Sequence, residues 1–113
     1  MLNVCAFTGN LASEPLYFDG EQPRAVFTLA VDHNGKTADG QKKTEFLDFV
    51  AWRGTAEYIH KYCHKGDMLS VRSEARKREL VKDGVKSFKY EFHVDSVDMV
   101  KRAKSNWDDA ENS

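Results

Sequence analysis

The sequence has 113 residues, of which 41% are hydrophobic and 31% are charged. The composition is typical of a soluble globular protein. The length indicates one domain, because a second independent core would leave each half near the lower size limit for unaided folding. No apolar stretch approaches the roughly 20 residues that span a bilayer, and no basic residue precedes Arg24 to begin a secretory signal. We therefore expect a cytoplasmic protein that is not embedded in a membrane.

The formal net charge of -1 indicates no class of partner, but the charge is unevenly distributed. Residues 72–89 contain seven basic and three acidic residues, a local excess of four positive charges that could face phosphates. Residues 103–113 are acidic and polar, and we expect a short disordered tail there, after a domain at 1–102. Cys5 and Cys63 are too few and too far apart for a disulfide framework, so both are expected to be reduced, buried thiols.

Alternation of apolar and polar residues, which places side chains on the two faces of a strand, dominates the sequence. A loop with Pro15 and a turn at Gly20 interrupts it first, and a turn-rich or flexible loop at 33–43 follows. A turn at 82–84 then joins two long strands into a hairpin. We predict five strands, at residues 4–8, 24–31, 44–53, 68–81 and 85–100.

One segment, residues 55–65, has helical spacing, since Ile59 and Cys63 recur on one face. Thr55 can cap the start of this helix and Gly66 can end it. Three strands, a helix and a long hairpin form the order of the five-stranded oligonucleotide and oligosaccharide binding (OB) barrel, which carries its helix between the third and fourth strands. The sequence therefore predicts an all-β domain with the OB fold.

A surface for single-stranded nucleic acid needs flat apolar rings for the bases and cations along the backbone. In the strand at 44–53, Phe46 and Trp52 lie on the face opposite Leu47 and Phe49. If Leu47 and Phe49 point into the barrel, the two rings point out. By the same alternation, one face of the next strand carries Arg72, Arg76, Arg78 and Leu80. The candidate nucleic-acid-binding residues are Lys43, Phe46, Trp52, Arg53, Arg72, Arg76, Arg78, Leu80 and Lys86.

Several motifs occur in order along residues 2–100. They are Asn3 with Thr8-Gly9-Asn10-Leu11 and Pro15, then the strand at 25–31, then Thr44-Glu45-Phe46 with Trp52-Arg53, and finally Ala56-Glu57, Tyr62 and Lys65-Gly66-Asp67. In these motifs the chain resembles the bacterial and phage single-stranded DNA-binding proteins. The helix and its lysine-glycine exit are the most specific of them.

The resemblance implies an OB fold and binding to single-stranded DNA without sequence preference, in replication, recombination and repair. It places base-stacking aromatics at Phe46 and Trp52, and a basic strand at Arg76 and Arg78. Members of the family are homotetramers or, in some phages, dimers, so the resemblance implies a homo-oligomer, with a tetramer favoured.

The chain also departs from the family pattern. His33 and Leu80 stand where many members have a stacking aromatic, which predicts weaker binding or a smaller site per subunit. Asp48, between the two retained rings, would repel phosphate. The acidic end lacks the terminal phenylalanine with which cellular members recruit other proteins, although it could still contact replication or repair proteins.

Other interpretations remain open. The two rings at Phe46 and Trp52 could pack against a loop or a second subunit, in an adaptor such as a primosomal replication-restart protein or in an RNA-binding OB domain. His60, Cys63 and His64 have a spacing that metal ligands can use on a helix, but no fourth ligand is near them in sequence. We expect no catalytic residue, no metal and no cofactor. The carboxylates Glu45, Asp48, Asp95 and Asp98 could in principle form a metal-dependent nuclease cluster, but nothing in the spacing of these four residues favours it.

Overall fold

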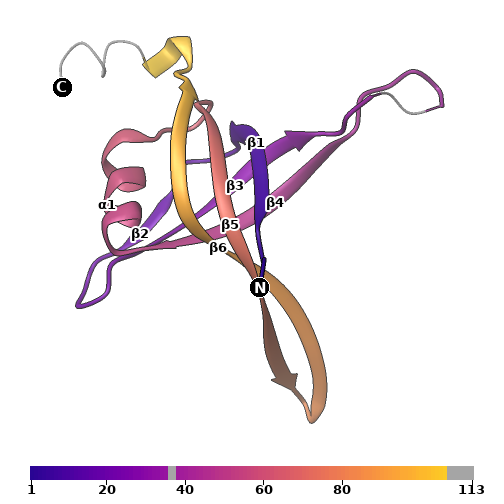
Figure 1. Cartoon of the computed structure of the whole chain (residues 1–113), viewed down its shortest axis with the longest axis vertical. Helices are drawn as coiled ribbons and strands as arrows, with labels where there is room; N and C mark the ends of the chain where they lie inside the picture. Colours follow the sequence, from indigo (N-terminus) through magenta and orange to yellow (C-terminus); the bar gives the residue numbers. More distant parts are fainter. Residues whose placement is uncertain (36–37, 107–113) are drawn as a thin grey trace.

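The computed structural model describes residues 1–35 and 38–106 of the chain. Its strands are β1 (Cys5–Leu11), β2 (Leu16–Phe18), β3 (Arg24–Asp32), β4 (Thr44–Trp52), β5 (Met68–Lys82) and β6 (Val85–Lys101). The helix α1 (Arg53–Tyr62) lies between β4 and β5, and a short 3-10 helix, η1 (Lys104–Asn106), follows β6. Figure 1 shows two arms that leave the body of the domain: one holds the end of β3 and the start of β4, and the other is the outer half of the β5–β6 hairpin.

The sheet closes on itself. Its strand order is β1-β5-β6-β4-β3-β2, and β1 also pairs with β3, so five strands form a ring and β2 lies outside it on the edge of β3. The pairing of β4 with β6 is parallel, whereas the other pairs are antiparallel. The predicted all-β OB barrel, with its helix between the third and fourth strands of the ring, is confirmed.

Gly9 allows β1 to pair with two neighbours. Asn10, the next residue, pairs with Met68 of β5 and also with Ala30 of β3. A Cβ atom at Gly9 would lie 2.5 Å from the carbonyl oxygen of Ala30 and 2.9 Å from the Cγ2 atom of Val31. No side chain fits at that distance, so the close approach that closes the ring requires glycine.

The interior of the ring is filled by alternate residues of its strands and by one face of α1. Phe7, Phe49 and Phe92 pack together, with ring centroids 5.2 to 5.6 Å apart. Phe49 is buried and Phe7 and Phe92 are partly buried. A fully buried side chain of this kind contributes about 1.5 to 3 kcal/mol to folding. The buried residues of the core are Leu11, Ala25, Phe27, Leu29, Phe49, Ala51, Ala56, Ile59, Cys63, Leu69, Val71 and Val94.

Asp67 connects the segment that follows α1 to the end of β1 and to the residues that follow β6. Its buried carboxylate accepts the backbone N–H of His64 at 3.0 Å and that of Ala103 at 2.8 Å. Its backbone carbonyl accepts the N–H of Leu11 at 2.8 Å. The chain is therefore attached to the barrel at least as far as Ala103. The domain boundary at 102 stays a prediction, and residues 107–113 of the expected tail lie outside the described residues.

The two cysteines differ in their surroundings. Cys63 is buried, and burial, with the nearby Asp67 carboxylate, raises the pKa of its thiol to about 12. It therefore stays a protonated thiol at neutral pH, in agreement with the prediction. Cys5 is only half-buried, so the expectation that it is buried was wrong.

The strand predictions differ from the structure at the start of the chain. The strand expected at 4–8 runs from Cys5 to Leu11, because Gly9 continues the ladder instead of ending it. The short strand β2 was not predicted, since three residues carry too little alternation to be recognised. Among the described residues the sheet accordingly has six strands, of which five make the barrel.

The helix also differs from its predicted range of 55–65. It begins at Arg53, whose φ of 55° turns the chain directly from β4 into α1, and Thr55 does not cap it. It ends at Tyr62, four residues before Gly66, which lies in a separate turn with φ 94°. Among the described residues, no helix has the length and apolar character that crossing a membrane requires.

The substitution Gly9→Ala tests the closure of the ring. We expect it to lower the free energy of unfolding by about 1 to 3 kcal/mol, because β1 and β3 must move apart to admit the methyl group. Gly54→Ala is the matched control: its Cβ position in α1 has no atom within 4 Å, and alanine favours a helix by up to about 1 kcal/mol. Urea unfolding followed by circular dichroism measures both changes. Equal effects at the two glycines would contradict this account of ring closure.

Candidate nucleic-acid interface

A groove of about 640 Å³ lies on the outer face of β2, β3 and β4, beside the base of the β5–β6 hairpin. Its floor consists of cross-strand rows, because directly paired residues of neighbouring strands share a face. One row is Phe18, Arg24 and Trp52, and the next is Leu16, Val26 and Val50. The hairpin forms the wall with Arg78, Lys89, Tyr90, Glu91, Phe92 and His93.

Phe46 and Trp52 both line this groove. Their side chains are 65% and 38% exposed, whereas Phe49, on the opposite face of β4, is 2% exposed. Six residues of an extended strand span about 20 Å, so the two rings lie toward opposite ends of the groove. Asp48 lies between them and accepts a hydrogen bond from the hydroxyl of Thr28 at 2.6 Å. The groove thus has an aromatic ring toward each end, Phe46 or Trp52, and the carboxylate of Asp48 between them.

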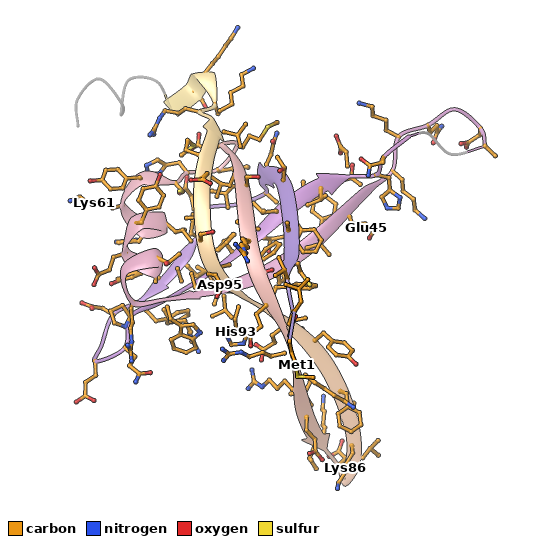
Figure 2. All side chains as sticks on the ribbon, in the orientation of Figure 1. Met1, Glu45, Lys61, Lys86, His93 and Asp95 are labelled. Carbon is orange, nitrogen blue, oxygen red and sulfur yellow. The ribbon has the colours of Figure 1, made fainter. Side chains whose placement is uncertain are left out.

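Trp52 is positioned by His93 of β6. The indole N–H donates a hydrogen bond to Nδ1 of His93 at 3.2 Å, and the two rings are within 14° of parallel, with centroids 6.5 Å apart. Since the N–H bond lies in the plane of the indole, the imidazole lies beside the edge of Trp52 and the two rings form one broad flat surface. Figure 2 shows His93 where the hairpin leaves the barrel.

Burial lowers the pKa of His93, and the guanidinium of Arg76 lowers it further, whereas Glu91 and Glu74 act in the opposite direction. His93 is therefore a neutral imidazole at neutral pH, and the hydrogen bond from the indole identifies Nδ1 as its unprotonated nitrogen. The orientation of Trp52 depends on this neutral imidazole.

Two arginines of β5, Arg76 and Arg78, are paired with carboxylates. Nε of Arg76 donates to Glu74 at 3.0 Å, and Nη1 of Arg78 lies 3.6 Å from Glu91 on β6. Arg78 lines the groove, while Arg76 lies outside its lining. Exposed pairs of this kind contribute about 0 to 1 kcal/mol, so a phosphate can replace the carboxylate at little cost.

Three candidates of β5 and β6 lie away from the groove. Arg72 lies between Ala6 of β1 and Ser96 of β6, on another part of the barrel surface. Leu80 is in the projecting part of the hairpin and is not among the lining residues. Lys86 is near the tip of the hairpin, as Figure 2 shows, where its Nζ atom is 3.6 Å from Glu79.

The two candidates next to β4 are also separate from the groove lining. Lys43 precedes β4, and its carbonyl accepts the N–H of His33 at 2.7 Å. Arg53 begins α1 at the other end of the strand. The structure thus brings three of the nine candidates together in the groove, namely Phe46, Trp52 and Arg78. A role in binding for the other six stays a prediction.

The sequence reasoning missed Phe18 and Arg24. The Cζ atom of Arg24 lies 4.5 Å from the centroid of the Phe18 ring and 6.0 Å from that of Trp52. The apolar pair Leu16 and Phe18, two residues apart and directly before a strand, is the signal that could have indicated β2. His93 was missed because only the parallel pairing of β4 with β6 brings it to Trp52.

The possible metal and nuclease clusters are not assembled. His60 stacks on Tyr17 with centroids 4.2 Å apart, Cys63 is buried in the core, and Nδ1 of His64 lies 3.4 Å from Glu14. Within residues 1–35 and 38–106, no group of three or more histidine, cysteine or acidic side chains is placed to hold a metal ion. Of the four carboxylates considered, Glu45 contacts His33 at 2.8 Å and Asp48 contacts Thr28.

Comparisons with known proteins identify relatives of the chain. Among similar proteins, Single-stranded DNA-binding protein 1 of Streptococcus pyogenes serotype M18 is 34% identical over 80 residues, which make up 69% of this chain and 62% of that protein. The Single-stranded DNA-binding protein of Streptococcus mutans is 31% identical over 80 residues, 69% of this chain and 49% of the relative. That of Lactococcus lactis, Single-stranded DNA-binding protein 1, is 29% identical over 108 residues, 93% of this chain and 72% of the relative.

The chain thus spans less than two thirds of the length of the first two of these relatives. The model of the single-strand binding protein family matches residues 2–100, which include β1 to β5 and all of β6 except its last residue, Lys101. With a closed OB ring and a match over nearly the whole domain, the chain belongs to the single-strand binding protein family.

Proposed function

We propose that the chain binds single-stranded DNA without sequence preference, through the groove on β2, β3 and β4, and so protects it during replication, recombination and repair. The observation that carries this proposal is the exposure of two aromatic rings, Phe46 and Trp52, along a groove whose wall holds Arg78 and Lys89. Rings and cations in one groove are what sequence-tolerant binding requires. The family and the names of its bacterial relatives support the same function.

The proposed binding uses the groove floor for bases and its wall for the backbone. A base stacked on an aromatic ring contributes about 1 to 3 kcal/mol. Asp48 repels phosphates from the middle of the floor, which directs the sugar-phosphate backbone toward Arg78 and Lys89 on the hairpin. A phosphate there would take the place of Glu91 beside Arg78. No step of this binding requires a cofactor or a catalytic group.

We further propose that the protein acts as a homo-oligomer, with a tetramer favoured over a dimer, in the cytoplasm of a bacterial or phage-infected cell. Exposed apolar side chains support assembly, because Leu2, Val4, Phe88 and Tyr90 all lie on the surface of the single chain. Sedimentation analysis would give the mass as a multiple of the 12.9 kDa subunit. Contacts of the acidic tail with replication or repair proteins remain part of the proposal.

Titration of Trp52 fluorescence with oligo-dT, in a Trp107→Phe background, tests the proposed function. We expect quenching that saturates at a fixed number of nucleotides and is reversed by salt, since a stacked base quenches the indole and salt competes for the phosphates. Separately, Trp52→Ala should weaken binding by about 5- to 150-fold.

The control for this titration is Tyr62→Ala, which removes an aromatic side chain on α1 that is also 38% exposed. It should leave the affinity for oligo-dT unchanged. An absence of quenching in a folded protein would reject stacking on Trp52 and favour the adaptor interpretation.

The lowered pKa of His93 predicts a dependence of stability on pH. An unfolded chain binds a proton at this histidine near its ordinary pKa of about 6.5, whereas the folded protein does so only at lower pH. His93 therefore reduces the free energy of unfolding as the pH falls below about 6.5, and has no such effect above it. Urea unfolding at pH 7.5 and 5.5, compared between the wild type and His93→Gln, isolates this contribution from the other histidines. An equal loss of stability in both proteins would contradict it.

A further inference from the structure

We propose that Arg24, held against the rings of Phe18 and Trp52, binds a backbone phosphate of the single strand. This inference rests on the proposed DNA binding and adds to it a phosphate site that lies on the floor of the groove, apart from the basic run of residues 72–89. It assigns a role to the short strand β2, which supplies Phe18.

The register of three strands places these side chains in one row. Phe18 of β2 pairs with Arg24 of β3, and Arg24 pairs with Trp52 of β4. Directly paired residues share a face of the sheet, so all three project toward the groove, which they line. The guanidinium carbon is 4.5 Å from the centroid of Phe18 and 6.0 Å from that of Trp52. The two rings thus restrict the guanidinium to one place.

The charge of Arg24 is available to a ligand. Arg76 and Arg78 each have a carboxylate partner, whereas no carboxylate lies within ion-pair distance of Arg24 in the described parts of the chain. Its Nε atom is buried there without a hydrogen-bond partner, and its terminal amino groups are neither buried nor bonded to described protein atoms. An uncompensated cation on the floor of an otherwise apolar row is an attractive site for an anion.

The geometry of the guanidinium suits a phosphate. A guanidinium that lies over a ring keeps its N–H groups free in its own plane, where they can donate two parallel bonds to phosphate oxygens. Trp52 remains partly exposed beside it. A nucleotide whose base stacks on Trp52 therefore carries a phosphate within reach of Arg24. The rings pre-organise the arginine, so little side-chain freedom is lost on binding.

Affinity for oligo-dT, measured across a series of salt concentrations with Arg24→Gln, tests the site. Loss of one phosphate contact should reduce the slope of log affinity against log salt by about 0.7, and should weaken binding at low salt on the order of tenfold. Arg24→Lys keeps the charge but lacks the planar fork, so it should retain the slope and still bind more weakly. If Arg24→Gln fails to fold, as judged by circular dichroism, the loss of affinity in Arg24→Lys decides.

Lys61→Gln is the matched control, because Lys61 is an exposed cation on α1, outside the groove, and is not one of the candidate binding residues. It should change the slope much less than Arg24→Gln. Equal changes for the two variants, or unchanged binding by both Arg24 variants in a wild type that binds DNA, would overturn the phosphate site and leave the proposed function intact. Failure of the wild type to bind oligo-dT would overturn the proposed function itself.

Discussion

The whole arrangement depends on the contact between Gly9 of β1 and Ala30 of β3. The backbone of Ala30 occupies the space that a side chain at position 9 would fill. Because of this close approach, β1 can complete the ring by pairing with β3 as well as with β5. Closure of the ring determines which side chains point into the barrel, and therefore also which point outward. Because the strand period is two, each residue next to a buried one points outward. Phe46 and Trp52 are exposed because Leu47, Phe49 and Ala51 belong to the core.

The outer face of the barrel is organised by two kinds of pairing. Antiparallel pairs build the rows of the groove floor, and the parallel pair of β4 with β6 brings the base of the hairpin against it. The cations on the two sides differ in their surroundings. Arg78 on the wall is paired with Glu91, while Arg24 on the floor lies against the rings of Phe18 and Trp52 and has no carboxylate partner within residues 1–35 and 38–106. A ligand would therefore have to displace a carboxylate from the arginines of the hairpin, whereas at Arg24 it would displace none from the described part of the chain.

Local alternation was sufficient to predict the faces of β4 and β5, and hence the outward position of Phe46, Trp52 and Arg78. It could also place Glu74 beside Arg76, since residues two apart share a face. It could not show that Glu91 meets Arg78 or that His93 meets Trp52, because these contacts depend on the register of strands far apart in the sequence. Strand β2 was too short to be recognised, so Phe18 and the environment of Arg24 were missed with it. The start of α1 was misplaced because the prediction assumed a capping side chain, whereas the helix begins at Arg53, where a positive φ turns the chain, and has no side-chain cap.

The closed ring also determines the order in which the protein can acquire its structure during synthesis. Strand β1 emerges first, but its partners in β5 begin only at Met68. Strand β4 pairs with the middle of β6, at Phe92 and His93, which is synthesised later still. Until then β1, β3 and β4 expose apolar faces and unpaired edges, which makes the incomplete chain prone to aggregation. Contacts between residues so distant in sequence slow folding, since loop-closure entropy must be lost before they form. A chain interrupted within the hairpin therefore cannot close the ring, and nearly the entire domain must leave the ribosome before the barrel is complete.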